Sequence, residues 1–441
     1  MMKTAALSEE QAPEPQVGAD FTQDENAALR KAAWRLIPLL ALAYFFNYLD
    51  RTSVGFAALT MNQDLGLTAA QFGIGAGIMF AAYCLCEVPS NLAMYRFGAR
   101  KWIARIMITW GLAAAATAWS VGPNSFYAFR LLLGVAEAGF FPGVIFFLTL
   151  WFPAKYRARV LAWFTVSTPL SSLIGGPVAV WLLQFDGALG LAGWQWMFIV
   201  TGLPACLLGL VVLVVLADKP AEARWLTEAQ RNALQGLLEK EGAAASTRKS
   251  MKGALKDPRV YLMALISFSF TLGSYGIGIW LPQILKTHGV SLGATGWVSA
   301  IPYFFATIGL IWWAAHVDRH GRAIKHLVMA CLLAALAMVF SVAFGSLVPA
   351  MVGITLALVG TISARTIFYT IPGKFLSGQA AAGGLAFINS IGALGGFAGP
   401  YLVGYLKDLT GSFAAGMIGM AVILTFAAGL SLSIRLFMKD N

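Results

Sequence analysis

Residues 40–59 read LALAYFFNYLDRTSVGFAAL, a mostly apolar run with an acid and a base, Asp50 and Arg51, side by side at its middle. With its flanks, the run is long enough to cross a bilayer, which takes about 20 apolar residues in a helix. A charge at that depth is unfavourable by about 2.5 kcal/mol or more unless it is paired or hydrated, so it marks a functional position. The segment therefore predicts a membrane-spanning helix that carries part of a site.

The composition of the whole chain indicates the same solvent. Of 441 residues, 59% are hydrophobic and 12% charged, and the mean hydropathy is +0.72, whereas a soluble domain holds about 25% charged residues. The net charge of +11 comes from short basic clusters between apolar runs, which does not favour nucleic acid as a partner. All four cysteines lie inside apolar runs and form neither a disulfide framework nor a metal site. We therefore expect an integral membrane protein without a metal or a cofactor.

Apolar segments of spanning length follow one another along the chain, often separated by Gly, Pro, Asn or Asp. We predict twelve transmembrane helices, at 33–58, 70–95, 101–121, 125–151, 158–184, 192–216, 259–284, 293–316, 322–345, 348–373, 377–406 and 413–437. The longest connection follows the sixth span and contains one amphipathic stretch, TEAQRNALQGLLEKEG (residues 227–242), which predicts a cytoplasmic surface helix.

This connection divides the chain into two halves. We predict four parts: a disordered cytoplasmic tail at 1–31, a six-helix bundle at 32–217, a cytoplasmic central loop at 218–257 and a second six-helix bundle at 258–441. The halves are similar to each other, because an Arg-x-Gly turn follows the second span of each, in YRFGARKW (95–102) and VDRHGRAI (317–324). Two pseudo-symmetric all-α bundles are typical of a transporter that moves around a site at the membrane midplane.

The basic residues predict the orientation. All but five of the 31 lysines and arginines fall in the tails, in the even-numbered loops or in the adjacent span ends. Because Lys and Arg in short loops stay on the cytoplasmic side, we expect a multi-pass protein of the cell inner (plasma) membrane with both termini cytoplasmic. The five exceptions are Arg51, Arg130 and Arg365 within spans, and Lys286 and Lys407 on the other side.

Three acids and three bases lie within the predicted spans: Asp50, Arg51, Glu87, Arg130, Glu137 and Arg365. One interpretation is structural, with balanced ion pairs that hold the bundle together. The geometry favours a functional one for Arg130 and Glu137. They are seven residues apart, about 10.5 Å along one helix face, which is too far for a direct ion pair. Each therefore needs another partner or a ligand.

Asn47, Tyr48 and Arg51 share one face of the first span, since they are three and four residues apart. Arginine suits carboxylate binding because its guanidinium donates two parallel hydrogen bonds. Our hypothesis is that Arg51 receives a substrate carboxylate while Asp50, about 100° round the helix, faces a different partner. Asp50 and Glu137 would carry a coupled proton, and Arg130 would exchange between these two acids.

Several motifs together resemble the major facilitator superfamily. VDRHGR (317–322) is similar to its signature turn, and other stretches resemble its anion:cation symporter branch: NYLDR (47–51), EVPSNL (87–92), RLLLGVAEAGFFPG (130–143), WFPAKYRAR (151–159) and INSIGALGGFAGP (388–400). That branch contains permeases for sugar acids, tartrate and aromatic carboxylates. The turn of the first half departs from the pattern, with Tyr95 where an acid is usual, so we expect a weaker charge contact at the cytoplasmic gate there.

The resemblance implies roles for individual residues. An arginine at the position of Arg51 meets the substrate anion in this branch, and acids that match Asp50 and Glu137 handle protons. The resemblance also implies that Tyr83 and Gln283 reach the substrate.

Two further candidates lie in the second half. The resemblance implies that Asn389 contacts substrate hydroxyls, and Tyr369 is a candidate for the cavity wall. For Arg365 two interpretations stay open, because its long side chain could reach the membrane interface or could attract anions.

The expected function is import of an organic anion, such as a sugar acid, tartrate or a hydroxylated aromatic acid, by proton symport and alternating access. We expect no enzymatic activity, and no Walker loop is present that would indicate an ATP-driven pump. Two alternatives stay open. One is proton-coupled efflux of drug-like compounds, of whose glycine-proline pattern LIGGPVAVW (173–181) is only a fragment. The other is a transporter-like anion sensor that signals through the central loop. We expect a monomer.

Overall fold

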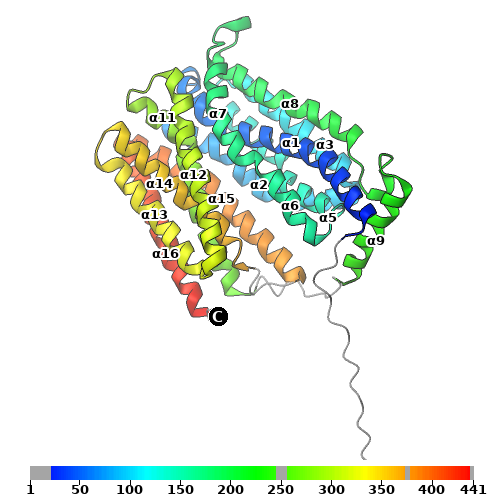
Figure 1. Cartoon of the computed structure of the whole chain (residues 1–441). Helices are drawn as coiled ribbons and strands as arrows, with labels where there is room; N and C mark the ends of the chain where they lie inside the picture. Colours follow the sequence, from blue (N-terminus) through cyan, green and yellow to red (C-terminus); the bar gives the residue numbers. More distant parts are fainter. Residues whose placement is uncertain (1–20, 245–255, 373–377, 438–441) are drawn as a thin grey trace, which may run out of the picture.

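The computed structural model describes residues 21–244, 256–372 and 378–437, and within them the secondary structure is entirely helical (Figure 1). The predicted all-α class is confirmed. The α-helices are α1 (Gln23–Asp64), α2 (Ala69–Phe97), α3 (Ala99–Ala116), α4 (Pro123–Glu137), α5 (Phe140–Thr149), α6 (Ala154–Thr165), α7 (Ser167–Leu183), α8 (Gly193–Val215), α9 (Glu228–Ala244), α11 (Pro258–Thr287), α12 (Leu292–His320), α13 (Ala323–Ala343), α14 (Leu347–Phe368), α15 (Gly378–Thr410) and α16 (Phe413–Phe437). Three short 3₁₀ helices lie in connections, η1 (Thr117–Trp119), η2 (Ala188–Gly190) and η3 (Pro220–Glu222).

Among the described residues, eleven segments are long and apolar enough to cross a membrane, with α4 and α5 forming one of them and α6 and α7 another. They correspond to every predicted span except the third. That span is α3 followed by η1, and it carries Arg100, Lys101 and Arg105 in its first two turns, so its composition alone is not apolar enough. Because α3 packs along α8 inside the bundle, it completes the twelve predicted spans.

The first helix begins earlier than predicted. Thr22 and Glu25 form a capping box, in which the Glu25 N–H donates to the Thr22 hydroxyl over 3.3 Å and the Thr22 N–H donates to the Glu25 carboxylate over 2.7 Å. In the next turns Ala28 and Leu29 are fully buried, and α9 packs against α1. The predicted disordered tail at 1–31 is therefore wrong for residues 23–31, which are helical. Residues 1–20 of that tail lie outside the described residues.

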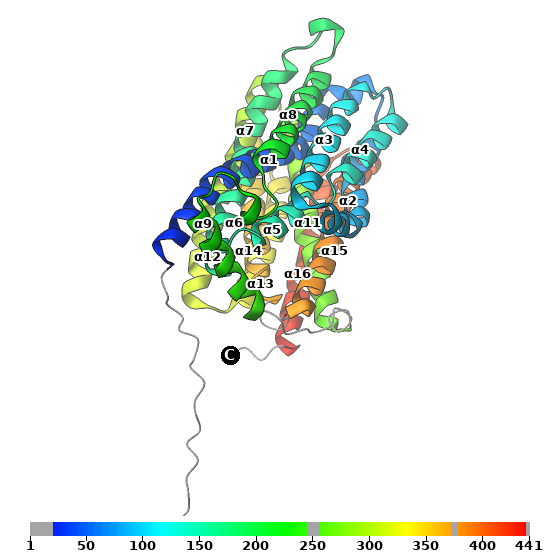
Figure 2. The same ribbon diagram turned by 90° about the vertical axis from the view of Figure 1, so that its right-hand side faces the viewer.

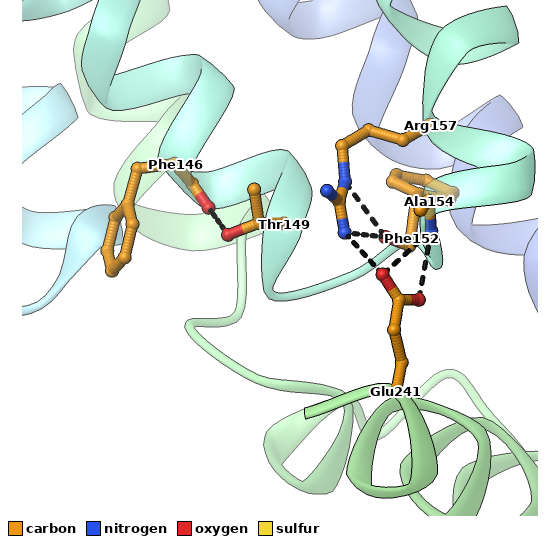
Figure 3. Close-up of polar contacts among 6 residues, drawn as sticks. All are labelled: Phe146, Thr149, Phe152, Ala154, Arg157 and Glu241. Atoms are coloured by element: carbon orange, nitrogen blue, oxygen red, sulfur yellow. Dashed lines mark hydrogen bonds and ion pairs between the residues drawn. The ribbon is translucent and has the colours of Figure 1, made fainter. Parts of the chain in front are cut away.

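The amphipathic stretch in the central connection forms α9, and this helix is fixed to the first half. The Glu241 carboxylate accepts a hydrogen bond from the Ala154 backbone N–H at the start of α6 (2.9 Å) and one from the Arg157 guanidinium (3.4 Å), as Figure 3 shows. Arg157 also donates to the Phe152 carbonyl over 3.0 Å. A carboxylate is stabilised at a helix N-terminus by the unpaired N–H groups there, so Glu241 joins α9 to α6. Residues 245–255 of the predicted loop lie outside the described residues.

The helices gather in two groups, with α1 to α9 on one side of the molecule and α11 to α16 on the other (Figure 1). The first described helix begins at the same end of the molecule at which α9 lies and the last helix, α16, ends, while the connection between α7 and α8 projects from the other end (Figure 2). We call the first end the terminal face and the second the opposite face. The groups meet where α1 packs on α11, α2 on α15 and α7 on α12.

Glycines allow the two halves to approach most closely near the opposite face. A Cβ atom on Gly55 of α1 would lie 2.6 Å from the Ile279 carbonyl oxygen of α11, and one on Gly176 of α7 would lie 2.5 Å from the Gly296 carbonyl oxygen of α12. Real Cβ atoms do not come this close to another backbone, so these positions require glycine. We call these two contacts the opposite-face seal.

Two polar contacts between the halves lie beside this seal. The Asp408 carboxylate, in the last turns of α15, accepts hydrogen bonds from the backbone N–H groups of Ala69 (3.0 Å) and Ala70 (2.8 Å) at the start of α2. The Lys286 ammonium of α11 donates to the Leu59 carbonyl of α1 over 3.0 Å. Both contacts join the halves at the opposite face, so the molecule is closed there.

Candidate functional site

A cavity of about 110 Å³ lies between the two halves. On α1 and α11 its lining residues, Arg51 and Tyr275, precede Gly55 and Ile279 of the seal, so the cavity lies on the terminal side of the closure. Both halves supply its wall, which consists of Tyr44, Tyr48, Arg51, Phe80, Tyr83, Glu87, Phe141, Ser267, Thr271, Tyr275, Arg365, Tyr369, Asn389, Gly392 and Ala393.

The strongest polar contact at the cavity joins α1 to α4. The Arg51 guanidinium forms an ion pair with Glu137, donating from both Nε (2.7 Å) and Nη2 to the same carboxylate oxygen. The Asn47 amide donates to that oxygen as well, over 2.8 Å. The Arg51 side chain is 14% exposed and that of Glu137 1% exposed, so Arg51 stands at the cavity surface with Glu137 behind it. In this conformation the arginine that we predicted to receive a substrate carboxylate holds a carboxylate of the protein.

Glu137 owes its position to a break in the fourth span. It is the last residue of α4, and Gly139, two residues later, adopts a φ of 88° before α5 begins. This left-handed conformation favours glycine, and a Cβ on Gly139 would also lie 2.5 Å from the Ser90 hydroxyl oxygen. The break places the Glu137 carboxylate at a helix end, where it faces α1.

A second pair of charges lies deeper in the first half. Asp50 is 1% exposed and Arg130 is fully buried, and the charge of each acts on the other. Within the described residues, neither Asp50 oxygen and none of the Arg130 guanidinium nitrogens has a hydrogen-bond partner. Buried charges without such bonds are unfavourable, so this pair is poised to change partner or protonation state.

Aromatic rings surround the outer side of Arg51. Its guanidinium carbon lies 5.6 Å from the centre of the Phe80 ring and 5.3 Å from that of Tyr83, both distances within the range of a cation–π contact. Its Nη1 donates to the Tyr275 hydroxyl of α11 over 3.4 Å. Tyr275 in turn packs on Phe80, with 4.4 Å between ring centres, so this arginine is held by groups from both halves.

The second half contributes one charge and several neutral polar groups to the cavity wall. Arg365, from the last turn of α14, lines the cavity with its side chain exposed. Nearby, the Tyr369 hydroxyl donates to the side-chain oxygen of Asn389. Glu87 of α2 accepts from the Ser390 hydroxyl of α15 over 3.4 Å. Of the two interpretations left open for Arg365, the cavity position agrees with attraction of an anion.

The structure places most of the predicted substrate contacts together. Arg51, Tyr48, Tyr83, Tyr369 and Asn389 all line the cavity. The remaining predicted residues of the first half, Asn47, Asp50, Arg130 and Glu137, lie behind this wall rather than on it.

Gln283 does not line the cavity. It lies eight residues after Tyr275 on α11, about 12 Å further along the helix and beyond the seal at Ile279. It is therefore on the wrong side of the closure to reach a ligand in this conformation.

Sequence reasoning missed Tyr275 and Tyr44 as cavity residues. Ser267, Thr271 and Tyr275 are spaced four apart and form one polar face of α11. This spacing was the available signal for Tyr275. Nothing comparable marks Tyr44, which follows the apolar pattern of the first span.

The family follows from a comparison with known proteins, because the family model described as Major Facilitator Superfamily matches residues 40–400. The chain belongs to the Major Facilitator Superfamily. Members of this superfamily are membrane transporters, and the chain is accordingly a transporter and not an enzyme. The predicted pair of six-helix bundles is the fold of this superfamily.

Two relatives within the superfamily are similar over nearly the whole chain. An Agrobacterium vitis protein named "Putative tartrate transporter" is 48% identical over 92% of this chain and 91% of its own. An Acinetobacter baumannii protein named "Quinolone resistance transporter" is 42% identical over 95% of this chain and 96% of its own.

Among solved structures, a bacterial homologue of the human lysosomal transporter Spinster, in an inward-facing and occupied conformation, superposes with a TM-score of 0.75. The alignment covers 91% of this chain and 97% of that chain at 17% identity. At that identity the likeness concerns the fold alone. The chain thus has the Major Facilitator fold, and relatives whose names include an organic-acid transporter indicate a small organic substrate.

Proposed function

We propose that this protein imports a small organic anion by proton symport, with the two halves alternately opening the central cavity to either side of the cell inner membrane. The terminal face would be cytoplasmic, since the basic residues concentrate in the loops that reach it. The observation that carries the proposal is the Arg51–Glu137 pair at the cavity wall, where a substrate carboxylate can replace a carboxylate of the protein.

Charge and size support a small carboxylic acid as the substrate. Two arginines and several hydroxyl and amide groups line the cavity, and arginine binds carboxylates through paired hydrogen bonds. The volume of about 110 Å³ is well below the roughly 300 Å³ or more of pockets that hold drug-sized ligands. The name of the 48% identical relative adds tartrate as a specific candidate.

Coupling follows from competition for Arg51. While Glu137 is ionised, it occupies the Arg51 guanidinium through two donors and also accepts from Asn47. A proton on Glu137 removes its charge and weakens both contacts, because hydrogen bonds between ionised groups are roughly twice as strong as neutral ones. Arg51 is then free to bind the substrate carboxylate. The carrier therefore loads substrate and proton together.

Asp50 and Arg130 provide a second place for the proton. Protonation of Asp50 removes the acid whose charge acts most strongly on Arg130, so the arginine turns toward Glu137, the other acid that acts on it. This exchange links the state of Asp50 to that of Glu137 and hence to Arg51.

The test is uptake of labelled L-tartrate and other short acids into proteoliposomes, with and without a pH gradient that is acidic outside. We expect accumulation that depends on the gradient and that falls to background in Arg51→Ala. Uptake that ignores the pH gradient would overturn the proton symport, and a lack of uptake of every carboxylic acid tried would overturn the anion class.

One observation favours a second candidate, proton-coupled efflux: the 42% identical relative is named as a quinolone resistance transporter. Export of a drug-like compound would be detected as lower accumulation of that compound in cells that express the protein. We expect no such decrease for lipophilic cations, because the described cavity wall contains two arginines, which repel a cation.

A further inference from the structure

Among the described residues, Arg365 is the one charged group that the second half presents to the cavity. In the part of the chain that the structure describes, the ion pairs join Arg51 to Glu137, Arg157 to Glu241 and Arg259 to Asp257, and none includes Arg365. The groups that act most strongly on its charge are phenols, those of Tyr48, Tyr369, Tyr275 and Tyr44. The guanidinium therefore faces the cavity among neutral oxygen atoms.

A cation in a membrane protein is normally paired or hydrated. The Arg365 side chain is exposed to the cavity and has no acidic partner among the described ion pairs, so it is open to an anion. Arg51 differs, since Glu137 balances its charge in this conformation. Glu87, the only acid in the cavity wall of the described chain, bonds to Ser390 instead and has Arg51 as its basic neighbour. The described cavity wall thus contains two arginines and one acid, and the arginine of the second half has no acidic partner in an ion pair.

The two arginines line the same small cavity, Arg51 from the first half and Arg365 from the second. Tyr275 and Tyr48 also line it. Arg51 donates to the Tyr275 hydroxyl, and both phenols feel the charges of both arginines. A cavity of about 110 Å³ with an arginine from each half suits an acid with carboxylates at both ends of a short chain.

We propose that Arg365 binds a second carboxylate of the substrate, so that a short dicarboxylate bridges Arg51 of the first half and Arg365 of the second. The inference rests on the proposed function and names its substrate class. Arg365 is then the residue that selects dianions over monoanions. A substrate bound to both halves at once also links their movement.

The neutral groups beside Arg365 fit hydroxyls on the same acid. Tyr369 donates its proton to the Asn389 side-chain oxygen, which leaves the Asn389 amide N–H groups as donors and the Tyr369 oxygen as an acceptor. A substrate hydroxyl can accept from the first and donate to the second. The preferred ligand is therefore a hydroxylated short dicarboxylate.

The experiment compares two acids of equal carbon number, L-tartrate with two carboxylates and L-threonate with one. Their affinities are measured by competition against labelled tartrate exchange in proteoliposomes and by thermal shift of the purified protein. We expect the wild type to bind tartrate at least ten-fold more tightly than threonate. Arg365→Gln should weaken tartrate by ten- to about a hundred-fold, the range for a hydrogen bond to a charged group, and threonate by less than about three-fold.

Two further variants keep the test decisive. Arg365→Lys retains the charge and should retain part of the preference for tartrate, and Thr366→Ala, at the neighbouring position, should leave the preference unchanged. If Arg365→Gln weakened both acids equally, or if the wild type did not distinguish them, Arg365 would not be the receptor of a second carboxylate. If the wild type bound neither acid but took up another carboxylic acid, the dicarboxylate inference would fail and the proposed function would stand. If it took up no carboxylic acid, the proposed function itself would fail.

Discussion

The two halves of the molecule treat charge differently. The first half buries acids and bases in contact with one another, whereas the described part of the second half offers the cavity a single arginine surrounded by phenols and an amide. A proton can be stored only where an ionisable acid changes partner, and the described cavity wall of the second half contains no acid. In the proposed cycle, proton handling therefore belongs to the first half and substrate selection largely to the second.

The strongest test of this division of roles between the halves is the substitution Glu137→Gln in the first half. The amide cannot release a proton and no longer holds Arg51 through an ion pair, so we expect proton-driven accumulation to fall by about a hundred-fold or more. Substrate exchange without a gradient should stay within about three-fold, because Arg51 is free to bind. Both are measured in proteoliposomes, with Glu239→Gln on the exposed face of α9 as a charge-matched control. Loss of substrate binding with intact proton-driven uptake would reverse the roles assigned here.

Substitutions at two glycines, Gly395 and Gly55, test packing within a half and packing between the halves separately. Gly395→Ala would place a Cβ 2.2 Å from the Phe268 carbonyl oxygen inside the second half, and such overpacking destabilises by about 1–3 kcal/mol. We expect a lower melting temperature in detergent. Gly236→Ala on α9, where a Cβ meets open space, is the control and should not lower it. An unchanged melting temperature in Gly395→Ala would contradict the close packing of α11 on α15.

Gly55→Ala acts on the opposite-face seal instead. Its Cβ would meet the Ile279 carbonyl oxygen of the other half, so the halves separate there without loss of either bundle. We expect faster alkylation of a Ser299→Cys reporter, which is buried beside Gly176 in the wild type, in a background without the native cysteines. A slower reaction, or a fall in melting temperature as large as that of Gly395→Ala, would show that the seal does not open independently.

A smaller shift is expected from Asp408→Asn. The change removes the negative charge of the Asp408 carboxylate, which accepts hydrogen bonds from two N–H groups at the start of α2. Such a charge at a helix N-terminus stabilises by roughly 0.3–1 kcal/mol. The reporter at position 299 should therefore react about two- to five-fold faster. Asp186→Asn, on the loop between α7 and α8 within the first half, is the matched control and should leave the reaction rate unchanged.

The smallest effect concerns the pH dependence of stability at the start of the second half. The Arg259 guanidinium, bonded to Asp257, lowers the pKa of that carboxyl below its usual value. A lowered pKa in the folded state stabilises the fold above about pH 3.9, and this contribution is lost as the pH falls through the folded pKa. We expect Asp257→Asn to lower the melting temperature slightly at pH 6 and to make no difference near pH 2. An equal decrease at both pH values would exclude the charge as its cause.

The fold could be predicted from the sequence because the thickness of the bilayer sets the length of each span and the basic loops set the orientation of the spans. One boundary was misjudged for a local reason. The acidic composition of residues 1–31 suggested a disordered tail, although Thr22 and Glu25 have the spacing of a capping box. The third span was predictable despite its charges, because Arg100, Lys101 and Arg105 lie at the membrane end of α3, where a span tolerates charge.

The candidate site was predictable only as far as neighbours along one helix. Asn47, Tyr48 and Arg51 share a face by spacing alone, and both Asn47 and Arg51 do contact Glu137. The partner itself was not predictable, because the rotation and height of α4 against α1 depend on the break at Gly139. Gln283 failed for the same reason, since its place beyond the seal depends on how two helices meet.

The opposite-face seal has an electrical consequence. Between the spans it consists of glycines and backbone carbonyls, at Gly55 with Ile279 and at Gly176 with Gly296. Moving one elementary charge across the membrane potential is worth about 2.3 kcal/mol per 100 mV, but a neutral backbone contact moves none when it opens. In the proposed cycle, the voltage therefore works not on the seal itself but on the charges carried in the cavity and on the charged side chains beside the seal, Asp408 and Lys286. The net charge of the loaded site is the part of this set that changes when substrate and proton bind.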